Sequence, residues 1–384
     1  MHPKKLAARF TTYCGLFVLF ASELAGQSPW PQPQSGWLYV LDARGSSRDD
    51  AHIILVDPAA GISKGSITVG YAPQFVVSPD GLKMVVVSGA ANKGEVTIYD
   101  SRSGRAITKD DVPFRIIYTS WATDTTLALS RDGQWLFVET MQTVAEGTDV
   151  YGIQRFQIGN DFIHAAGHGS LPGCGVAELI PLDGPDWDVM VHCGSSNMLR
   201  LLRFDSTGNV SNIKDLALPV RPYDAASGQM AQEPLATRAI SYYGGSDSIL
   251  ALSGSNEVCR LDVLTGAGPC STLLNRMLGR WIPPGPWPRS PEGHVWYFGS
   301  GPVTARSQGM ATAIEIVDAS TLALQGSINA SKPFWSLAVA KNGSFLYAAN
   351  PADQTIMRFD AVSRRQVNEI ALPGSKPAVI IPVP

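Results

Sequence analysis

The stretch Val96-Thr-Ile-Tyr-Asp-Ser-Arg-Ser-Gly104 decides the fold of this 384-residue chain. Its β-branched and aromatic residues favour a pleated strand. Asp100 can cap the following turn by accepting backbone N–H bonds, and Gly104 can take the positive φ that ends the turn. The same phrase recurs about every 40–60 residues, which for a chain of short strands is typical of a β-propeller. The seven copies lie at 53–61, 96–104, 153–161 (with Gln157 in the Asp position), 201–208, 258–266, 314–321 and 356–363.

A second repeated motif, a polar residue followed by Gly, precedes a hydrophobic strand in most repeats. Its clear copies are Asp80-Gly81, Asp132-Gly133, Asp183-Gly184, Glu292-Gly293 and Asn342-Gly343, and looser versions lie at 35–36 and 244–245. Each blade therefore reads as strand, turn, strand, loop, strand, Asp turn, strand. The sequence predicts an all-β fold, a seven-bladed β-propeller of four-stranded antiparallel blades.

The two ends of the chain complement each other. The first repeat begins at Trp37, directly on a second strand, so its first strand is missing. Residues 374–382 near the C-terminus resemble 70–78, which open the second blade. We expect Ala378–Val383 to pair beside Trp37–Leu41 and to close the ring, which hides two sheet edges.

The N-terminal residues 1–26 are typical of a secretory signal peptide. They combine an early basic cluster, the apolar run Thr11–Ala21 and small residues at 24–26. The apolar run is short for a bilayer, so no transmembrane span is expected after signal removal, and an uncleaved anchor is the alternative. Residues 27–36 form a Pro-rich lead, and 37–384 form a single propeller domain. A net charge of −3 without a basic cluster gives nucleic-acid binding no electrostatic support.

Four cysteines remain outside the signal peptide, and an even number in an exported chain favours disulfides over the alternative of four buried thiols. Cys259 and Cys270 lie on either side of one turn, so a hairpin would place them opposite each other within bridging distance. Cys174 and Cys193 fall on consecutive predicted strands of blade four. We predict the pairs Cys174–Cys193 and Cys259–Cys270.

The sequence contains few features that resemble catalytic motifs. No HExxH, CxxC or dinucleotide fingerprint is present, and the spacing of Gly167-His-Gly-Ser170 does not match a nucleophile elbow. His192 beside Cys193 is best explained as a structural residue. We therefore predict no catalytic, cofactor-binding or metal-binding residue on this chain.

Long loops on a rigid ring are where binding usually resides. Four stretches are expected to be such loops: Gln142–Thr148, Pro219–Pro234, Arg280–Pro288 and Gly301–Gly309. Within the third, Trp281 and Trp287 are candidates for a partner interface, with packing in the core as the alternative.

From about Trp37 onward the chain resembles the heavy chain of methylamine and aromatic amine dehydrogenases, which is a seven-bladed propeller. Four segments carry the resemblance: Leu171–Cys174 with Val191–Cys193, which are similar to an intrablade disulfide segment; Gly279–Trp287, similar to a GW…PGGW loop; Ile314–Ala323, similar to VVVLDAKTGE; and Ser344–Tyr347 with Ile356–Asp360, similar to the last blade.

The resemblance implies a heavy subunit without the redox cofactor. In that family a small Cys-rich light chain carries tryptophan tryptophylquinone, oxidises a primary amine to an aldehyde, and passes electrons to a periplasmic cupredoxin-type copper protein. This sequence departs in two places. Asp42–Asp49 has no aromatic residue where the family places one near the substrate channel, and Cys259 and Cys270 are additional.

Three functions follow as expectations. The first is the heavy subunit of a periplasmic quinoprotein amine dehydrogenase, within a hetero-oligomer. The second is a free-standing YVTN-like propeller that binds a protein or ligand without catalysis. The third, a lactonase-like hydrolase, would need a cluster of acids and His that the sequence does not locate.

Overall fold

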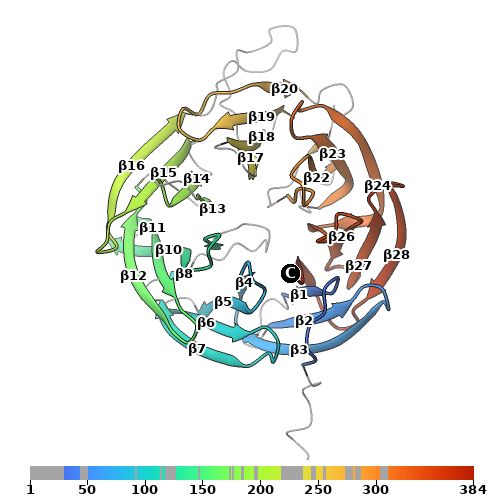
Figure 1. The fold of residues 1–384 in the computed structure, drawn as a ribbon, viewed down its shortest axis with the longest axis horizontal. Helices are drawn as coiled ribbons and strands as arrows, with labels where there is room; N and C mark the ends of the chain where they lie inside the picture. Colours follow the sequence, from blue (N-terminus) through green and yellow to red (C-terminus); the bar gives the residue numbers. More distant parts are fainter. Residues whose placement is uncertain are drawn as a thin grey trace, which may run out of the picture.

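The computed structural model describes residues 30–43, 51–90, 93–112, 115–116, 127–145, 148–172, 174, 177–182, 186–193, 198–217, 237–243, 248–253, 257–272, 280–281, 287–302 and 310–384. These residues form seven antiparallel sheets arranged as blades around a central axis (Figure 1). The described residues contain strands and no helix, and therefore no helix that is long and apolar enough to cross a membrane. The predicted fold class is confirmed.

The strands run outward in each blade from the centre of the ring. In blades one to three, from inner to outer strand, they are β29 (Pro377–Pro382), β1 (Leu38–Asp42), β2 (Ala51–Asp57) and β3 (Ile62–Gly70); β4 (Gln74–Val77), β5 (Lys83–Ala90), β6 (Lys93–Asp100) and β7 (Ala106–Val112); and β8 (Arg115–Ile116) with β9 (Leu127–Leu129), β10 (Trp135–Ala145), β11 (Thr148–Ile158) and β12 (Ile163–Ser170).

Blades four to seven follow in chain order. Their strands are β13 (Ala177–Pro181), β14 (Val189–Cys193), β15 (Met198–Phe204) and β16 (Val210–Ala217); β17 (Thr237–Tyr243), β18 (Ser248–Ser253), β19 (Glu257–Asp262) and β20 (Cys270–Thr272); β21 (Arg280–Trp281), β22 (Val295–Pro302), β23 (Ala311–Asp318) and β24 (Leu324–Phe334); and β25 (Ser336–Val339), β26 (Phe345–Asn350), β27 (Thr355–Asp360) and β28 (Arg365–Ala371).

The C-terminal strand closes the ring as predicted. β29 pairs antiparallel with β1, with Leu38 opposite Pro382 and Val40 opposite Ile380. The closure is supported at one end by the bond from the Val383 N–H to the Trp37 carbonyl, 2.9 Å. Blade one is therefore built from both ends of the described chain. β29 is the inner partner of β1, so the second strand of this blade is not left without a partner on its inner side.

The Asp turns form as the sequence predicts. In six blades the Asp carboxylate accepts bonds from backbone N–H groups two and three or four residues on; these Asp residues are Asp57, Asp100, Asp205, Asp262, Asp318 and Asp360. Each turn ends in the left-handed region. Glycine takes this conformation in most copies, but Leu322 (φ 60°) and Arg364 (φ 58°) take it in blades six and seven, where the sequence has no Gly.

The hydrophobic core lies between the blades rather than within one centre. Six clusters of buried side chains connect the blades around the ring. For example, Val85 and Val96 of blade two pack with Leu136 and Phe156 of blade three. Because each sheet buries both faces against its neighbours, the blades depend on one another for stability.

Side chains also tie five of the blades to the next one through one repeated contact, which we call a turn clamp. In a turn clamp, a donor on one blade bonds a backbone carbonyl in the Asp turn, or its blade-three equivalent, of the following blade. The described clamps are Lys83 to Gly159 (2.7 Å), Arg155 to Asp205 (3.2 Å), Lys214 to Leu264, Arg260 to Ser320 (3.2 Å) and Arg358 to Pro58 (3.3 Å).

The Pro-rich lead supplies a further clamp between blades one and two. Trp30 donates its indole N–H to the Ser101 carbonyl in the Asp turn of blade two, at 2.8 Å. Its ring stacks on Tyr39 of β1, with centroids 6.2 Å apart. The lead is therefore packed onto the ring at Trp30.

Candidate interaction face

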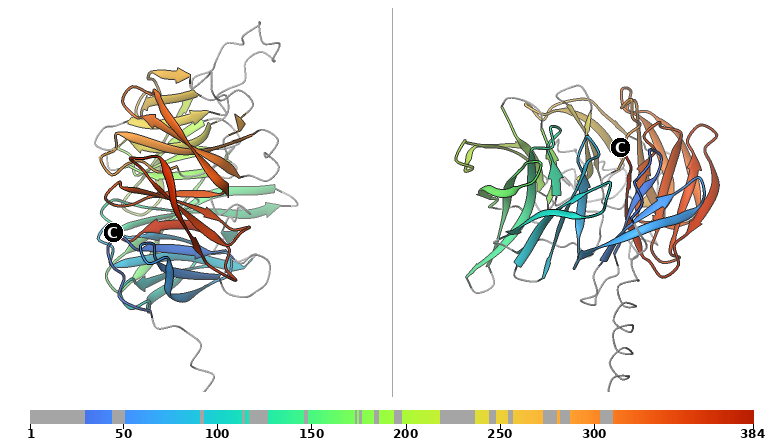
Figure 2. Two further views of the ribbon diagram at one scale, coloured as in Figure 1. Left: turned by 90° about the vertical axis from the view of Figure 1, so that its right-hand side faces the viewer. Right: turned by 60° about the horizontal axis from the view of Figure 1, so that its bottom comes forward.

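The blade topology gives the ring two different faces. Within each antiparallel blade, the first-to-second and third-to-fourth connections emerge at one face, which we call the turn face. The second-to-third and blade-to-blade connections emerge at the opposite face, the loop face, and Figure 2 shows the ring from the side. The turn face carries the Asp turns and the turn clamps. Of the predicted binding loops, Gln142–Thr148 belongs to the loop face, whereas Pro219–Pro234 and most of Gly301–Gly309 lie outside the described residues.

Blade three extends beyond the other blades on the loop face (Figure 2). The sequence predicted a loop over Gln142–Thr148, and this is wrong for most of the stretch. β10 and β11 each have eleven residues, and their ladder continues to Ala145 opposite Thr148. Because β12 pairs with β11 only as far as Gly152, the outermost residues form a two-stranded arm. The polar composition of this stretch concealed its strand character.

The inner strand is interrupted in blades three and six. In blade three, β8 and β9 pair with different parts of β10. In blade six, β21 pairs with the end of β22, and Arg289 forms a separate bridge to Trp296. The intervening residues 117–126 and 282–286 lie outside the described part of the chain.

The two candidate interface tryptophans lie on either side of the interruption in blade six. Trp287 is only 3% exposed, and its carbonyl accepts the indole N–H of Trp296 at 3.1 Å. Its ring lies so close to Gly299 that a Cβ there would be 2.6 Å from it. Trp287 therefore belongs to the core, and its prediction as a surface anchor is corrected. Only the backbone of Trp281 is described, so its role as an interface residue stays a prediction.

Both predicted disulfides are present. Cys174 pairs with Cys193 across 19 residues, and Cys259 pairs with Cys270 across 11. Cys259 and Cys270 are direct partners of the β19–β20 ladder, as the hairpin argument required. Cys174 differs from expectation, because it precedes β13 instead of lying on a strand. Disulfides are typical of proteins in oxidising compartments.

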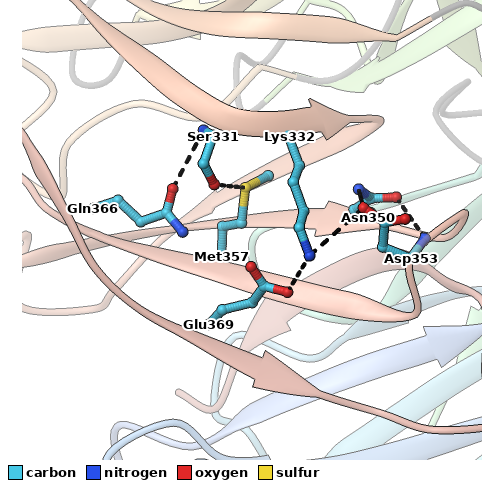
Figure 3. A network of polar contacts seen from close by, with 7 residues as sticks. All are labelled: Ser331, Lys332, Asn350, Asp353, Met357, Gln366 and Glu369. Atoms are coloured by element: carbon cyan, nitrogen blue, oxygen red, sulfur yellow. Dashed lines mark hydrogen bonds and ion pairs between the residues drawn. The ribbon is translucent and has the colours of Figure 1, made fainter.

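A polar network joins blades six and seven at the loop face (Figure 3). Between Asn329 and Phe334 the ladder of β24 is broken, and the bulged residues reach across to blade seven. Lys332 Nζ lies 2.6 Å from Glu369 Oε1 and 3.6 Å from Asp353 Oδ2. The hydrogen bond with Glu369 raises the pKa of Lys332, so the side chain remains an ammonium and cannot act as a neutral nucleophile.

The most buried carboxylate of blade six is held by hydroxyls. Glu315 is 2% exposed and accepts bonds from Ser300 Oγ at 2.5 Å and from Ser327 Oγ. Ser300 is also fully buried, whereas Ser327 is exposed. In blade three, burial lowers the pKa of His168, which lies 3.4 Å from Thr140 Oγ1. Among the described residues, no three His, Cys, Asp or Glu side chains converge as metal ligands.

The sequence interpretation missed the turn clamps and the Lys332 network. A signal for the clamps was present, because an Arg stands two residues before the Asp position in four repeats, at Arg155, Arg203, Arg260 and Arg358. Three of these four form clamps. The Lys332 network had no such signal, since it depends on the bulge in β24.

The chain was compared with family models, curated proteins and solved structures. No family model and no curated protein matches it. The periplasmic gluconolactonase PpgL of Pseudomonas aeruginosa has a similar structure, with a TM-score of 0.63 and 13% identity over 91% of this chain and 99% of that chain. A functionally unknown protein from Desulfotomaculum acetoxidans also has a TM-score of 0.63, with 12% identity and the same coverage. These likenesses establish the fold alone. The dihydro-heme d1 dehydrogenase NirN is a further neighbour, with a TM-score of 0.52 and 13% identity over 92% of this chain and 77% of that chain.

Proposed function

We propose that this chain is an exported propeller that binds a protein partner through its loop face and carries out no chemistry of its own. The difference between the two faces carries this proposal. The turn face is built from short Asp turns fixed by turn clamps. The loop face bears the two-stranded arm of blade three. A rigid ring that supports variable connections on one side suits recognition.

In its most specific form, the proposal makes the chain the heavy subunit of a periplasmic quinoprotein amine dehydrogenase. The Cys174–Cys193 disulfide within the segment that resembles that family supports this form. The partner would be a small Cys-rich light chain, whose tryptophan tryptophylquinone supplies the oxidation of primary amines, with a cupredoxin-type electron acceptor. The residues of this chain would then hold and orient the light chain, because side chains alone provide no suitable redox group.

The alternative form is a free-standing YVTN-like propeller that binds a different protein or ligand. Nothing in the described loop face distinguishes a light chain from another protein by its chemistry. The identity of the captured partner therefore decides between the two forms, while the position of the binding surface is common to both.

The experiment is a capture from periplasmic extract of the native host, with a tag after Pro384. That residue lies against Gly81 on the turn face, so the tag leaves the loop face accessible. In the arm-trimmed variant, residues 143–149 are replaced by Asn-Gly, a pair that favours a two-residue hairpin turn. Val362→Ser on the turn face is the control, since Val362 is 87% exposed. We expect the wild type and the control to retain a protein partner that the arm-trimmed variant loses.

The outcomes separate the forms of the proposal. A small Cys-rich partner with quinone absorbance and amine-dependent dye reduction supports the heavy-subunit form. A different partner that also depends on the arm supports the free-standing form. Partner binding that is lost in Val362→Ser and kept in the arm-trimmed variant contradicts the loop-face assignment. Hydrolysis of gluconolactone by the isolated chain contradicts the absence of catalysis.

A further inference from the structure

The two disulfides differ in their exposure to solvent. Cys174 is 4% exposed and Cys193 is fully buried, within the cluster between blades three and four. Cys259 is also buried, in the cluster between blades four and five, but Cys270 is exposed on the outer strand of blade five. Reduction begins when a thiolate attacks one sulfur of the disulfide, so access to that sulfur governs its rate. Only the Cys259–Cys270 pair has an exposed member.

The Cys259–Cys270 disulfide also occupies a particular place in its blade. In blade five the outer strand β20 begins at Cys270, four residues after the turn glycine Gly266. In blades one and two the outer strand begins one or two residues after that glycine. The disulfide therefore joins β19 to the first residue of a late-starting strand.

Few backbone bonds hold this strand in the described part of the chain. β20 pairs with β19 at three positions, and Cys259–Cys270 is the first of them. Two further bonds tie the preceding segment, from the Arg260 N–H to the Pro269 carbonyl and from the Asp262 N–H to the Ala267 carbonyl. The covalent bond thus supplements a short ladder on the solvent-exposed edge of the blade.

We propose that Cys259–Cys270 is a redox-labile clasp on the outer strand of blade five, opened by a dithiol reductant of the thioredoxin class. A reductant thiolate attacks the sulfur of Cys270, the exposed member of the pair, and forms a mixed disulfide, and Cys259 leaves with the electron pair and takes a proton. The second reductant thiol then attacks the mixed disulfide and releases Cys270. Two protein thiols form, and the reductant becomes a disulfide with the loss of two electrons. The Cys174–Cys193 disulfide stays intact under the same conditions.

Opening the clasp would act on the loop face as well as on blade five. As the outer strand of an antiparallel blade, β20 ends at the loop face. Once reduced, Cys259 behaves as a small buried hydrophobic residue, so the blade keeps its core while its edge loosens. The clasp itself does not depend on the proposed function, but an effect of reduction on partner capture does.

The test uses the oxidised full-length exported protein and a graded series of dithiothreitol, with a thioredoxin in parallel. New thiols are alkylated at each step and assigned by peptide mapping, and hydrogen exchange is followed on the same samples. After one fixed, short reaction time we expect Cys259 and Cys270 to be alkylated at about one tenth of the reductant concentration needed for Cys174 and Cys193, because attack on the exposed pair is faster. Exchange should rise over residues 267–272 and stay unchanged in blades one and two.

Matched variants keep the result interpretable. Cys259→Ser with Cys270→Ser should show the exchange pattern of the reduced clasp without reductant, and Cys174→Ala with Cys193→Ala should leave the clasp reducible. Reduction of both disulfides together, or of Cys174–Cys193 first, overturns the proposal. So does selective reduction without a change in exchange over 267–272. If a variant fails to fold, the measurements on the wild-type protein still decide. Selective reduction of the clasp that leaves partner capture unchanged would contradict the effect on capture and leave the clasp itself supported.

Discussion

The Asp carboxylate at the end of the third strand of a blade fixes the following turn by its charge as well as by its geometry. In blade six, Asp318 Oδ1 accepts bonds from the Ser320 hydroxyl at 2.6 Å and from the N–H groups of Ser320 and Thr321 at 2.9 and 2.8 Å. The hydroxyl bond from Ser320 and the backbone bond from Thr321 lower the pKa of Asp318 from 3.8 to about 2. The ionised form of this side chain is therefore part of the folded structure.

We predict that Asp318→Ala lowers the free energy of unfolding by about 1 kcal/mol at pH 7, because four donors, including Gln325 Nε2, lose a charged acceptor at an exposed turn. The pKa of Asp318 is lower in the folded state, so its contribution is complete above the usual value of 3.8 and is lost as the pH falls toward about 2. Urea unfolding at several pH values measures the difference between the two proteins, which should shrink below pH 3.8.

Asp318→Asn is the control for this prediction, since it keeps an acceptor oxygen but removes the charge. It should cost less than Asp318→Ala at pH 7. A difference between wild type and Asp318→Ala that stays constant through the acid range would show that the charge of Asp318 contributes nothing.

The turn clamps are hydrogen bonds that connect one blade to the next. Arg155 shows why the donor residues matter beyond the clamp bond itself. Its guanidinium lies 4.3 Å from the ring centroid of Trp135 in its own blade and 4.8 Å from that of Phe204 in the next. The side chain is thus both a packing element and a donor, which is a common use of arginine.

Arg203 offers an internal comparison for the clamp. It occupies the position of Arg155 in the next repeat, two residues before Asp205, but its side chain is exposed. We predict that Arg155→Ala destabilises the protein by about 2 kcal/mol through lost packing and a lost bond, and that Arg203→Ala changes stability by less than about 0.5 kcal/mol. Thermal and urea unfolding of the two variants measure the contrast. Equal losses of stability at the two positions would show that the clamp made by Arg155 does not contribute to the stability of the protein.

Sequence reasoning found the elements whose signal is local. The Asp turns and the Cys259–Cys270 pair depend on residues close together in the chain, so their spacing predicted them. Trp287 could not be assigned in this way, because whether an aromatic residue after a Pro-rich loop faces solvent depends on where the inner strand resumes. The arm of blade three was missed because its polar residues lack the alternation of a half-buried strand.

At the scale of the whole molecule, the ring depends on contacts between blades that only the closed structure brings together. The repeats predicted how many blades form, and the mismatch between the first and last repeats predicted how they close. The direction of the turn clamps, each from one blade to the next, could not be read from the repeats. Neither could the bulge of β24, through which Lys332 reaches Glu369 in blade seven.

The last prediction concerns ring closure by β29. Removing residues 376–384 leaves β1 without its inner partner and takes away Ile380, which packs in the cluster between blades seven and one. We expect this truncated chain to unfold at least about 10 °C below the full chain and to aggregate, because the ladder and its buried side chains are lost at an open edge. Scanning calorimetry and light scattering measure both effects.

A circular permutant provides the control, since the ring can be opened elsewhere without losing a strand. Pro384 lies beside the start of blade one, where the Val383 N–H bonds the Trp37 carbonyl, so a short linker can join Pro384 to the lead before Trp30. With new ends between β3 and β4, at 71–73, the permutant retains all pairs of β29 with β1. It should unfold within a few degrees of the full chain. A truncated chain as stable as this permutant would mean that the ring does not depend on its C-terminal strand.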